Sequence, residues 1–174
     1  YNSGKEHQNQ GALLSQGGSK TEALDEYQKS IAEYREAIGL QPDYPQAHEN
    51  LAVALYDIGD LQSALEEYRI AIDQYTKRDG RPTSQVVTNY GLALYDLGRY
   101  DDSAKAFGQA LQIEPSDHDL YVHRGFALQN AGRTQEARSD YERYLSLEPT
   151  GQYAEGVRQV LSGKANPPVR SGNQ

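Results

Sequence analysis

The chain of 174 residues contains no cysteine, methionine or tryptophan, and its aromatic residues are fourteen tyrosines and two phenylalanines. Without cysteine it can form no disulfide scaffold, thiolate metal site or cysteine nucleophile. No apolar run approaches the roughly 18 residues typical of a membrane span. Acidic residues outnumber basic ones by 25 to 17, and the pI is about 5.0. This balance is a poor footprint for a nucleic-acid binder, so we expect no nucleic-acid partner.

The two ends of the sequence leave the compartment open. The first residue is Tyr1 rather than methionine, so we expect either a soluble cytoplasmic domain or one tethered to a membrane through a missing N-terminal segment. Residues 163–174 include Pro167 and Pro168 and few apolar side chains. This composition predicts an extended tail.

Four glycines mark an internal repeat. They are Gly18, Gly59, Gly98 and Gly132, at spacings of 41, 39 and 34 residues. Seven positions before each of these anchor glycines stands a small residue: Gly11, Ala52, Gly91 and Gly125. Four positions before each anchor stands a leucine: Leu14, Leu55, Leu94 and Leu128. Five positions after each anchor stands a small residue: Ala23, Ala64, Ser103 and Ala137. Nine positions after each anchor stands an aromatic residue: Tyr27, Tyr68, Phe107 and Tyr141. So many matches in register indicate a repeat.

On both sides of each anchor, apolar residues recur at helical spacing, as in Leu51, Ala54 and Leu55 before Gly59. Each segment therefore predicts a helix, a glycine turn and a second helix, and the fold class is all-α. A single hairpin cannot bury both of its faces, so the hairpins must stack on one another.

This pattern resembles the tetratricopeptide repeat (TPR), with Pro115 and Pro149 seventeen residues after their anchors. The resemblance covers residues 4–151 and implies a right-handed α-solenoid of four repeats. We place them at 4–44 with a seven-residue insertion, 45–83 with a five-residue insertion, 84–117 and 118–151. We expect residues 152–162 to form a capping helix, because Ala154, Val157 and Leu161 share one side.

In TPR arrays the first helices line a concave groove, and the resemblance places one helical face of each repeat there. The candidate peptide-binding residues are Asn50, Asn89, His123, Val53, Leu92, Phe126, Tyr56, Tyr95, Asp57, Asp96 and Asn130. A carboxamide can pair with both the C=O and the N–H of an extended backbone, so an asparagine column suits sequence-tolerant peptide binding. The same asparagines could instead only support packing between helices, and the tyrosines could be packed between repeats rather than exposed.

The charges along this face favour one class of partner. Lys5 stands against Glu49, Asp57, Asp96 and Asp119, so we expect a neutral-to-basic peptide with apolar side chains. TPR domains that grip acidic chaperone tails use a basic clamp. Its positions here hold Glu49 and Val53, or Asp119 and His123, so we expect no acidic-tail clamp.

Catalysis, metal binding and cofactor binding find no support. Residues 17–21 resemble a phosphate loop, but Ser19 separates the glycines from Lys20 and no strand precedes them. Asp117, His118 and Asp119 could be drawn as a metal trio, but we expect Asp117 to cap the following helix. His123 and Asp119 are spaced to form a pH-sensitive ion pair. We therefore predict no enzyme, no metal and no cofactor.

The proposed role is a non-enzymatic interaction scaffold, used for complex assembly. Two alternatives stay open. The chain could self-associate, with its tail around Lys164 and Arg170 occupying a groove, or it could be the regulatory part of a larger enzyme.

Overall fold

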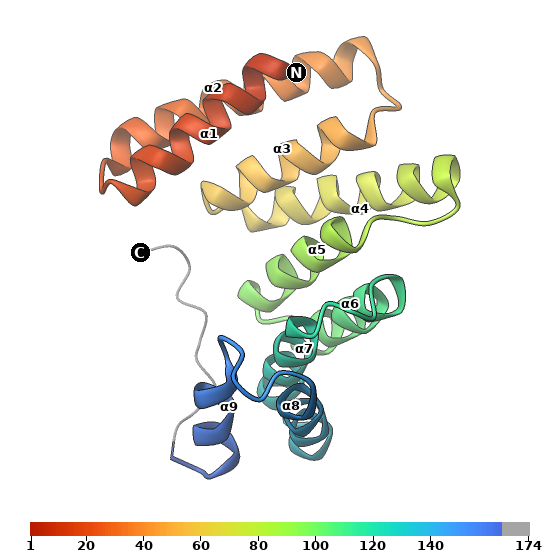
Figure 1. The fold of residues 1–174 in the computed structure, drawn as a ribbon. Helices are drawn as coiled ribbons and strands as arrows, with labels where there is room; N and C mark the ends of the chain where they lie inside the picture. The colour runs from red at the N-terminus through yellow and green to blue at the C-terminus, as the bar shows by residue number, and fades with distance from the viewer. Residues whose placement is uncertain (165–174) are drawn as a thin grey trace. The chain divides into compact units, whose positions relative to one another are not determined.

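The computed structural model describes residues 1–164, which form nine α-helices and no strand (Figure 1). The all-α fold class and the helix–turn–helix segments are therefore confirmed. The helices are α1 (Asn2–Gln16), α2 (Lys20–Leu40), α3 (Pro45–Asp57), α4 (Leu61–Asp79), α5 (Ser84–Asp96), α6 (Tyr100–Ile113), α7 (Asp119–Asn130), α8 (Thr134–Leu147) and α9 (Ala154–Leu161).

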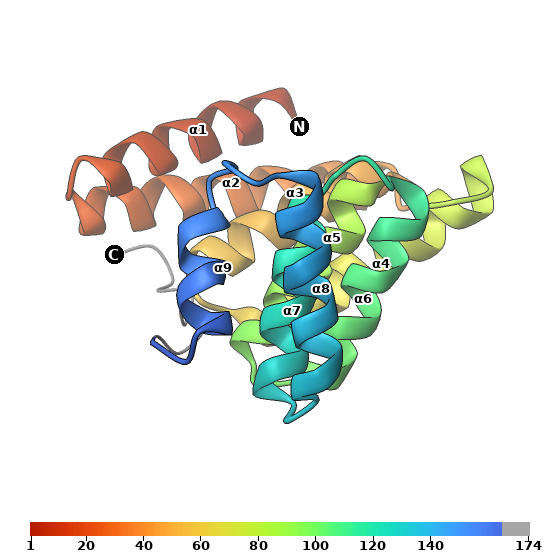
Figure 2. The ribbon, with the colours of Figure 1, turned by 60° about the horizontal axis from the view of Figure 1, so that its bottom comes forward.

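The helices fall into two compact units, divided between Pro82 and Thr83. Unit 1 holds the hairpins α1/α2 and α3/α4, and α2 packs on α3. Unit 2 holds the hairpins α5/α6 and α7/α8, with α6 packed on α7. The last helix, α9, lies against α8 in both ribbon views (Figures 1 and 2). Each hairpin thus buries a second face by stacking on its neighbour within the unit.

Each hairpin turns at its anchor glycine. All four anchors have a positive φ, between 74° and 85°, which residues with a Cβ adopt at a cost. At Gly59 the amide of the following residue, Asp60, donates to the Leu55 carbonyl at 2.9 Å. The turn therefore satisfies carbonyl groups that the end of α3 would otherwise leave open.

The core of each hairpin is an aromatic ring packed on a small residue. The side chains nine residues after the anchors are all buried: Tyr27, Tyr68, Phe107 and Tyr141. A Cβ added to Gly11 would lie 3.0 Å from the Tyr27 ring, and one on Gly91 would lie 3.0 Å from the Phe107 ring. The small residue of the first helix is thus required by the ring of the second helix in the same hairpin.

Both second helices of unit 1 are long. Helix α2 has 21 residues and α4 has 19, whereas α6 and α8 have 14 each. Their additional turns carry two buried tyrosines, Tyr34 and Tyr75. The Tyr34 hydroxyl donates to Gln8 and the Tyr75 hydroxyl donates to Glu49, each at 2.7 Å. The added turns therefore brace the first helix of their own hairpin.

Helix α9 is amphipathic. Ala154 and Val157 are buried, while Glu155 and Arg158 are exposed, so α9 gives the end of unit 2 a polar outer side. The proposed tail binding depends on residues 165–174, which lie outside the described residues. In the part of the chain that is described, no helix is both long and apolar enough to cross a membrane.

Candidate functional site

The predicted binding face of unit 1 is the side of α3 that carries Asn50, Val53 and Tyr56, all half-buried. The Asn50 side chain donates to the Tyr1 hydroxyl at 2.9 Å. The Tyr1 ring in turn packs on Tyr44, with ring centroids 4.8 Å apart. Asn50 therefore anchors the first residue, and one of its donors already has a partner within the unit.

Two carboxylates flank this face on α3. Glu49 accepts the Tyr75 hydroxyl, and Asp57 accepts a hydrogen bond from the Gln8 side chain. Burial raises the pKa of Glu49 despite the Tyr75 hydrogen bond. Burial also raises the pKa of Asp57 to about 6, and the Gln8 hydrogen bond offsets only part of that shift. Both carboxylates are thus held in partly dehydrated positions with neutral partners.

In unit 2, Tyr95 and Asn130 form a bridge between α5 and α7. The Asn130 side chain donates to the Tyr95 hydroxyl at 2.9 Å and to the Phe126 carbonyl at 2.9 Å. Only 9% of Tyr95 is exposed, and its ring meets the edge of Tyr100 at a centroid distance of 5.3 Å. The expectation that Tyr95 is exposed on the groove is therefore wrong, because the ring is needed to pack α5 against its neighbours.

Three other candidate binding residues on α5 and α7 keep part of their side-chain surface exposed to solvent. Asn89 is half-buried, and its side-chain oxygen accepts from Gln85 at 2.9 Å. Leu92 and Phe126 are also half-buried, and Phe126 packs on the Tyr141 ring at a centroid distance of 5.8 Å. These three residues can offer one carboxamide and two apolar contacts to a partner.

His123 and Asp119 are engaged by the segment that follows α8. The His123 ring stacks on Phe107 at 5.5 Å and meets the edge of Tyr153 at 5.8 Å. Asp119 accepts a hydrogen bond from Gln152 at 2.6 Å. Their positions in the repeat predict that both residues are open to a partner, but residues 152 and 153 cover part of this surface.

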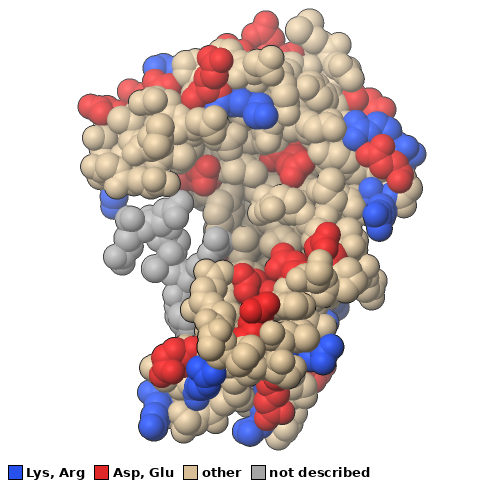
Figure 3. Space-filling model, viewed as in Figure 1, with Lys and Arg blue, Asp and Glu red and all other residues tan. Residues whose placement is uncertain are grey.

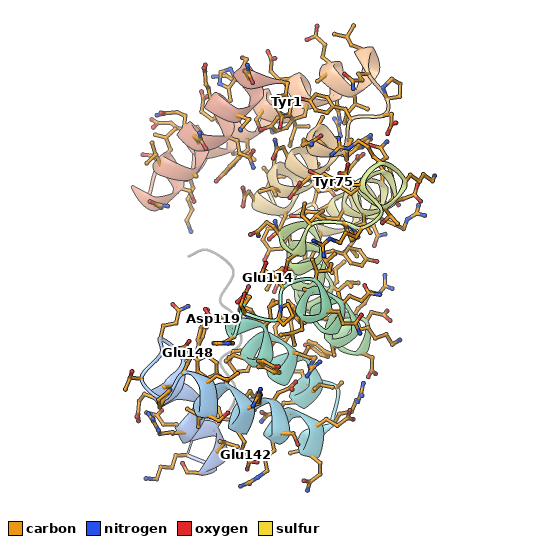
Figure 4. All side chains as sticks on the ribbon, turned by 45° about the vertical axis from the view of Figure 1, so that its right-hand side comes forward. Tyr1, Tyr75, Glu114, Asp119, Glu142 and Glu148 are labelled. Atoms are coloured by element: carbon orange, nitrogen blue, oxygen red, sulfur yellow. The ribbon has the colours of Figure 1, made fainter. Side chains whose placement is uncertain are left out.

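A shallow cavity of about 360 Å³ opens where α7 begins and α8 ends. Asp117, Asp119 and Glu148 contribute to its lining, and Figures 3 and 4 show acidic side chains in this part of unit 2. His118 lies 3.0 Å from a Glu148 oxygen. The prediction that Asp117 caps α7 is wrong: the cap residue is His118, without a side-chain cap hydrogen bond. Within residues 1–164 no three His, Cys, Asp or Glu side chains are placed to hold a metal ion.

The sequence analysis missed a set of acid–base pairs inside the hairpins. His7 pairs with Glu26 at 2.6 Å, and His48 pairs with Glu67 at the same distance. In the last hairpin, Arg124 makes two hydrogen bonds to Asp140, at 2.6 and 2.7 Å. In all three pairs the acid stands eight residues after the anchor glycine of its repeat, and both histidines stand eleven residues before theirs. The pairs could therefore have been predicted from the repeat register.

His48 is the most enclosed of these bases. Its second ring nitrogen lies 3.3 Å from the Pro42 carbonyl, so both nitrogens face acceptors. Burial alone lowers the pKa of His48, but the hydrogen bonds to Glu67 and Pro42 outweigh it, and the net pKa is raised. The residue therefore ties α3 to α4 and to the preceding loop.

Comparison with known proteins identifies the family of this fold. Models described as tetratricopeptide repeat match residues 85–117 and 108–162, and one described as TPR repeat matches residues 23–59. The chain belongs to the tetratricopeptide repeat family.

Curated relatives match over parts of the chain. The small glutamine-rich tetratricopeptide repeat-containing protein 2 of Mycosarcoma maydis is 30% identical over 106 residues, 59% of this chain and 28% of the relative. The Hsp70-Hsp90 organizing protein of Triticum aestivum is 34% identical over 59 residues, 34% of this chain and 10% of the relative. The chain thus spans less than a third of the length of either relative.

Solved structures share the fold at low identity. MamA matches with a TM-score of 0.69 and 19% identity, covering 84% of this chain and 85% of that one. YrrB, described as a TPR protein with an unusual peptide-binding site, matches with a TM-score of 0.66 and 18% identity over 92% and 78%. The first TPR of Spaghetti (RPAP3), bound to the HSP90 peptide SRMEEVD, matches with a TM-score of 0.57 and 21% identity over 68% and 93%.

Proposed function

We propose that this chain is a non-enzymatic scaffold for complex assembly, which binds an extended, neutral-to-basic segment of a partner protein. The observation that carries the proposal is the half-exposed face of α3. It presents Asn50, Val53 and Tyr56 beside the carboxylates Glu49 and Asp57. Apolar and carboxamide groups for an extended chain thus stand next to negative charge.

A second set of groups supports the same role in unit 2. Asn89 and Leu92 on α5, and Phe126 on α7, keep part of their side chains exposed. Tyr95 contributes by holding these helices in register, through its contact with Asn130. We assign Tyr95 and Asn130 to support of the binding face rather than to contact with the partner.

The comparisons support protein binding in general. YrrB is described by its peptide-binding site, and the Spaghetti TPR was solved with a peptide. That HSP90 peptide contains two glutamates and an aspartate. Our proposal departs from it in charge: by resemblance to TPR domains that bind acidic tails, the positions of the basic clamp here hold Glu49 and Val53, or Asp119 and His123.

The test is affinity purification with mass spectrometry, followed by titration of the bound segment. The groove variant combines Asn89→Ala with Val53→Asp, and the matched control is Gln109→Ala on the exposed side of α6. We expect the groove variant to lose about tenfold or more in affinity with unchanged helicity, and the control to bind normally. Equal binding by all three proteins contradicts the proposal.

A further inference from the structure

Glu49, Val53 and Asp57 lie in one line along α3, because residues four apart share a helical face. Glu49 and Asp57 are separated by eight residues, which at 1.5 Å per residue is about 12 Å along the helix axis. Val53 stands midway between them. All three side chains are half-buried, so each presents part of its surface to solvent.

Within residues 1–164 neither carboxylate has a cationic partner, although less buried acids have one. In the described part of the chain, Glu136, Glu142 and Asp102 each pair with an arginine or lysine at 3.3 Å or less. Those ion pairs are at the surface and contribute little. None of the ion pairs within residues 1–164 involves Glu49 or Asp57, although burial disfavours the charged form of both and raises their pKa.

The groups that lie directly against the two carboxylates in unit 1 are neutral. Asp57 faces Gln8 of α1, Tyr27 of α2 and Tyr68 of α4. Glu49 faces Tyr75 of α4 and lies near Tyr1. None of these five neighbours carries a positive charge. Lys5 and Arg78 lie over the Tyr1 and Tyr75 rings, 6.0 and 5.3 Å from the ring centroids, and within residues 1–164 neither forms an ion pair with Glu49 or Asp57. A cation from a partner would therefore gain two preformed acceptors that form no ion pair within unit 1.

An extended chain that runs along α3 matches this spacing. It advances about 3.3 Å per residue, and alternate side chains point to the same side. Side chains four residues apart are thus about 13 Å from each other and share a face, with one further side chain between them. This separation fits the distance from Glu49 to Asp57, and the middle side chain falls over Val53.

We propose that the α3 face formed by Glu49, Val53 and Asp57 binds a partner segment in which a basic residue, an apolar residue and a second basic residue stand at alternate positions. The two basic side chains pair with Glu49 and Asp57, and the apolar side chain packs on Val53. This assignment rests on the proposed function and adds the sequence pattern of the partner. An acidic or uncharged segment would leave both carboxylates without a counter-charge.

The test is selection of short random peptides displayed on phage against the full chain. The variant is Glu49→Gln with Asp57→Asn, which keeps an acceptor for Tyr75 and for Gln8. The control is Glu142→Gln on α8 (Figure 4), an exposed acid. It forms an ion pair with Arg138 of the same helix. We expect the unmodified chain and the control to enrich the alternating basic–apolar–basic pattern, and the double variant to lose that enrichment.

The outcomes separate this inference from the proposed function. Peptides selected without the pattern, or with the same pattern by the double variant, overturn the inference and leave peptide binding intact. Failure to enrich any peptide above an unrelated immobilised protein overturns both. A second measurement uses only the unmodified chain: replacing both basic residues of a selected peptide with glutamine should weaken binding about tenfold or more. Unchanged affinity for that peptide also contradicts the inference.

Discussion

The Asn130 side chain donates a hydrogen bond to the Tyr95 hydroxyl at 2.9 Å, and this contact joins the first helices of the two hairpins in unit 2. The same carboxamide also donates to the Phe126 carbonyl of its own helix. The side-chain nitrogen of Asn130 therefore makes both hydrogen bonds. This pair, which the sequence suggests for ligand contact, thus bridges the helices that carry Leu92 and Phe126.

Replacing Tyr95 with alanine should destabilise the chain by about 3 kcal/mol, because a large buried ring is lost and the cavity refills only partly. Tyr95→Phe should cost only about 1 kcal/mol, since it removes just the hydrogen bond. Urea unfolding followed by circular dichroism measures both changes. Equal stability of the Tyr95→Ala variant and the unmodified chain would show that the ring has no packing role.

The buried charge of Asp57 predicts an unusual pH dependence. Its pKa is raised to about 6 in the folded chain, so the folded state binds the proton more tightly than the unfolded state. The aspartate therefore costs stability as the pH rises from about 4 to above 6. Asp57→Asn should raise the free energy of unfolding at pH 7 by about 1–2 kcal/mol, after allowance for partial exposure.

That gain should shrink as the pH falls below 6, because the native aspartate is then protonated. Unfolding curves at pH 5 and pH 7 measure the difference, and Glu142→Gln on the exposed side of α8 serves as the control. A stabilisation that is the same at both pH values would contradict burial of an ionised Asp57.

The two equivalent His–Glu pairs of unit 1 should differ in strength. The His48 side chain is 8% exposed and that of His7 is 34% exposed, and the raised pKa of His48 reflects its two acceptors. His48→Ala should therefore cost about 2 kcal/mol at pH 6, and His7→Ala less than about 1 kcal/mol.

The stabilisation from His48 is fully present below pH 6.5 and is lost as the pH rises through the raised pKa of the folded chain. Chemical unfolding of both variants at pH 6 and pH 9 tests whether His48→Ala loses more stability than His7→Ala, and whether the loss for His48→Ala is smaller at pH 9. Identical losses for His7→Ala and His48→Ala would mean that enclosure of the pair adds nothing.

Two helical glycines should respond in opposite ways to the same substitution. A Cβ on Gly125 would collide with the Tyr141 ring, whereas one on Gly108 would come no closer than 3.6 Å, to the flexible end of Arg124. We expect Gly125→Ala to lose about 2 kcal/mol or more and Gly108→Ala to gain up to about 1 kcal/mol from helix propensity. Thermal unfolding of the two variants decides it, and a stable Gly125→Ala protein would refute the close packing of ring and backbone.

The repeat register made the fold predictable from sequence. The pairing of Tyr27 with Gly11 has an aromatic–small equivalent in every repeat, because a ring on the second helix needs a small residue on the first. Such a requirement places the same residue types at the same spacing in each repeat. The positions of the helices and turns can be predicted from that spacing. The all-α fold and the TPR family were therefore within reach of the sequence alone.

Contacts between side chains of different repeats were harder to predict. The Tyr95–Asn130 bridge depends on how deeply one ring sinks between helices, which a residue's position on a helical face does not determine. The cover over His123 comes from Tyr153, beyond the last repeat, where the register no longer applies. The pairing of His48 with Glu67 could be predicted from the residue spacing. That prediction requires comparing residues on the first helix of each hairpin with residues on its second helix.

The most direct test of the central claim is to map a selected peptide onto the isotope-labelled chain by nuclear magnetic resonance. We predict that saturable shift changes concentrate at Asn50, Val53 and Asp57 on α3. Changes confined to the outer sides of the second helices, around Gln109 or Glu142, would contradict a binding site on the first-helix face.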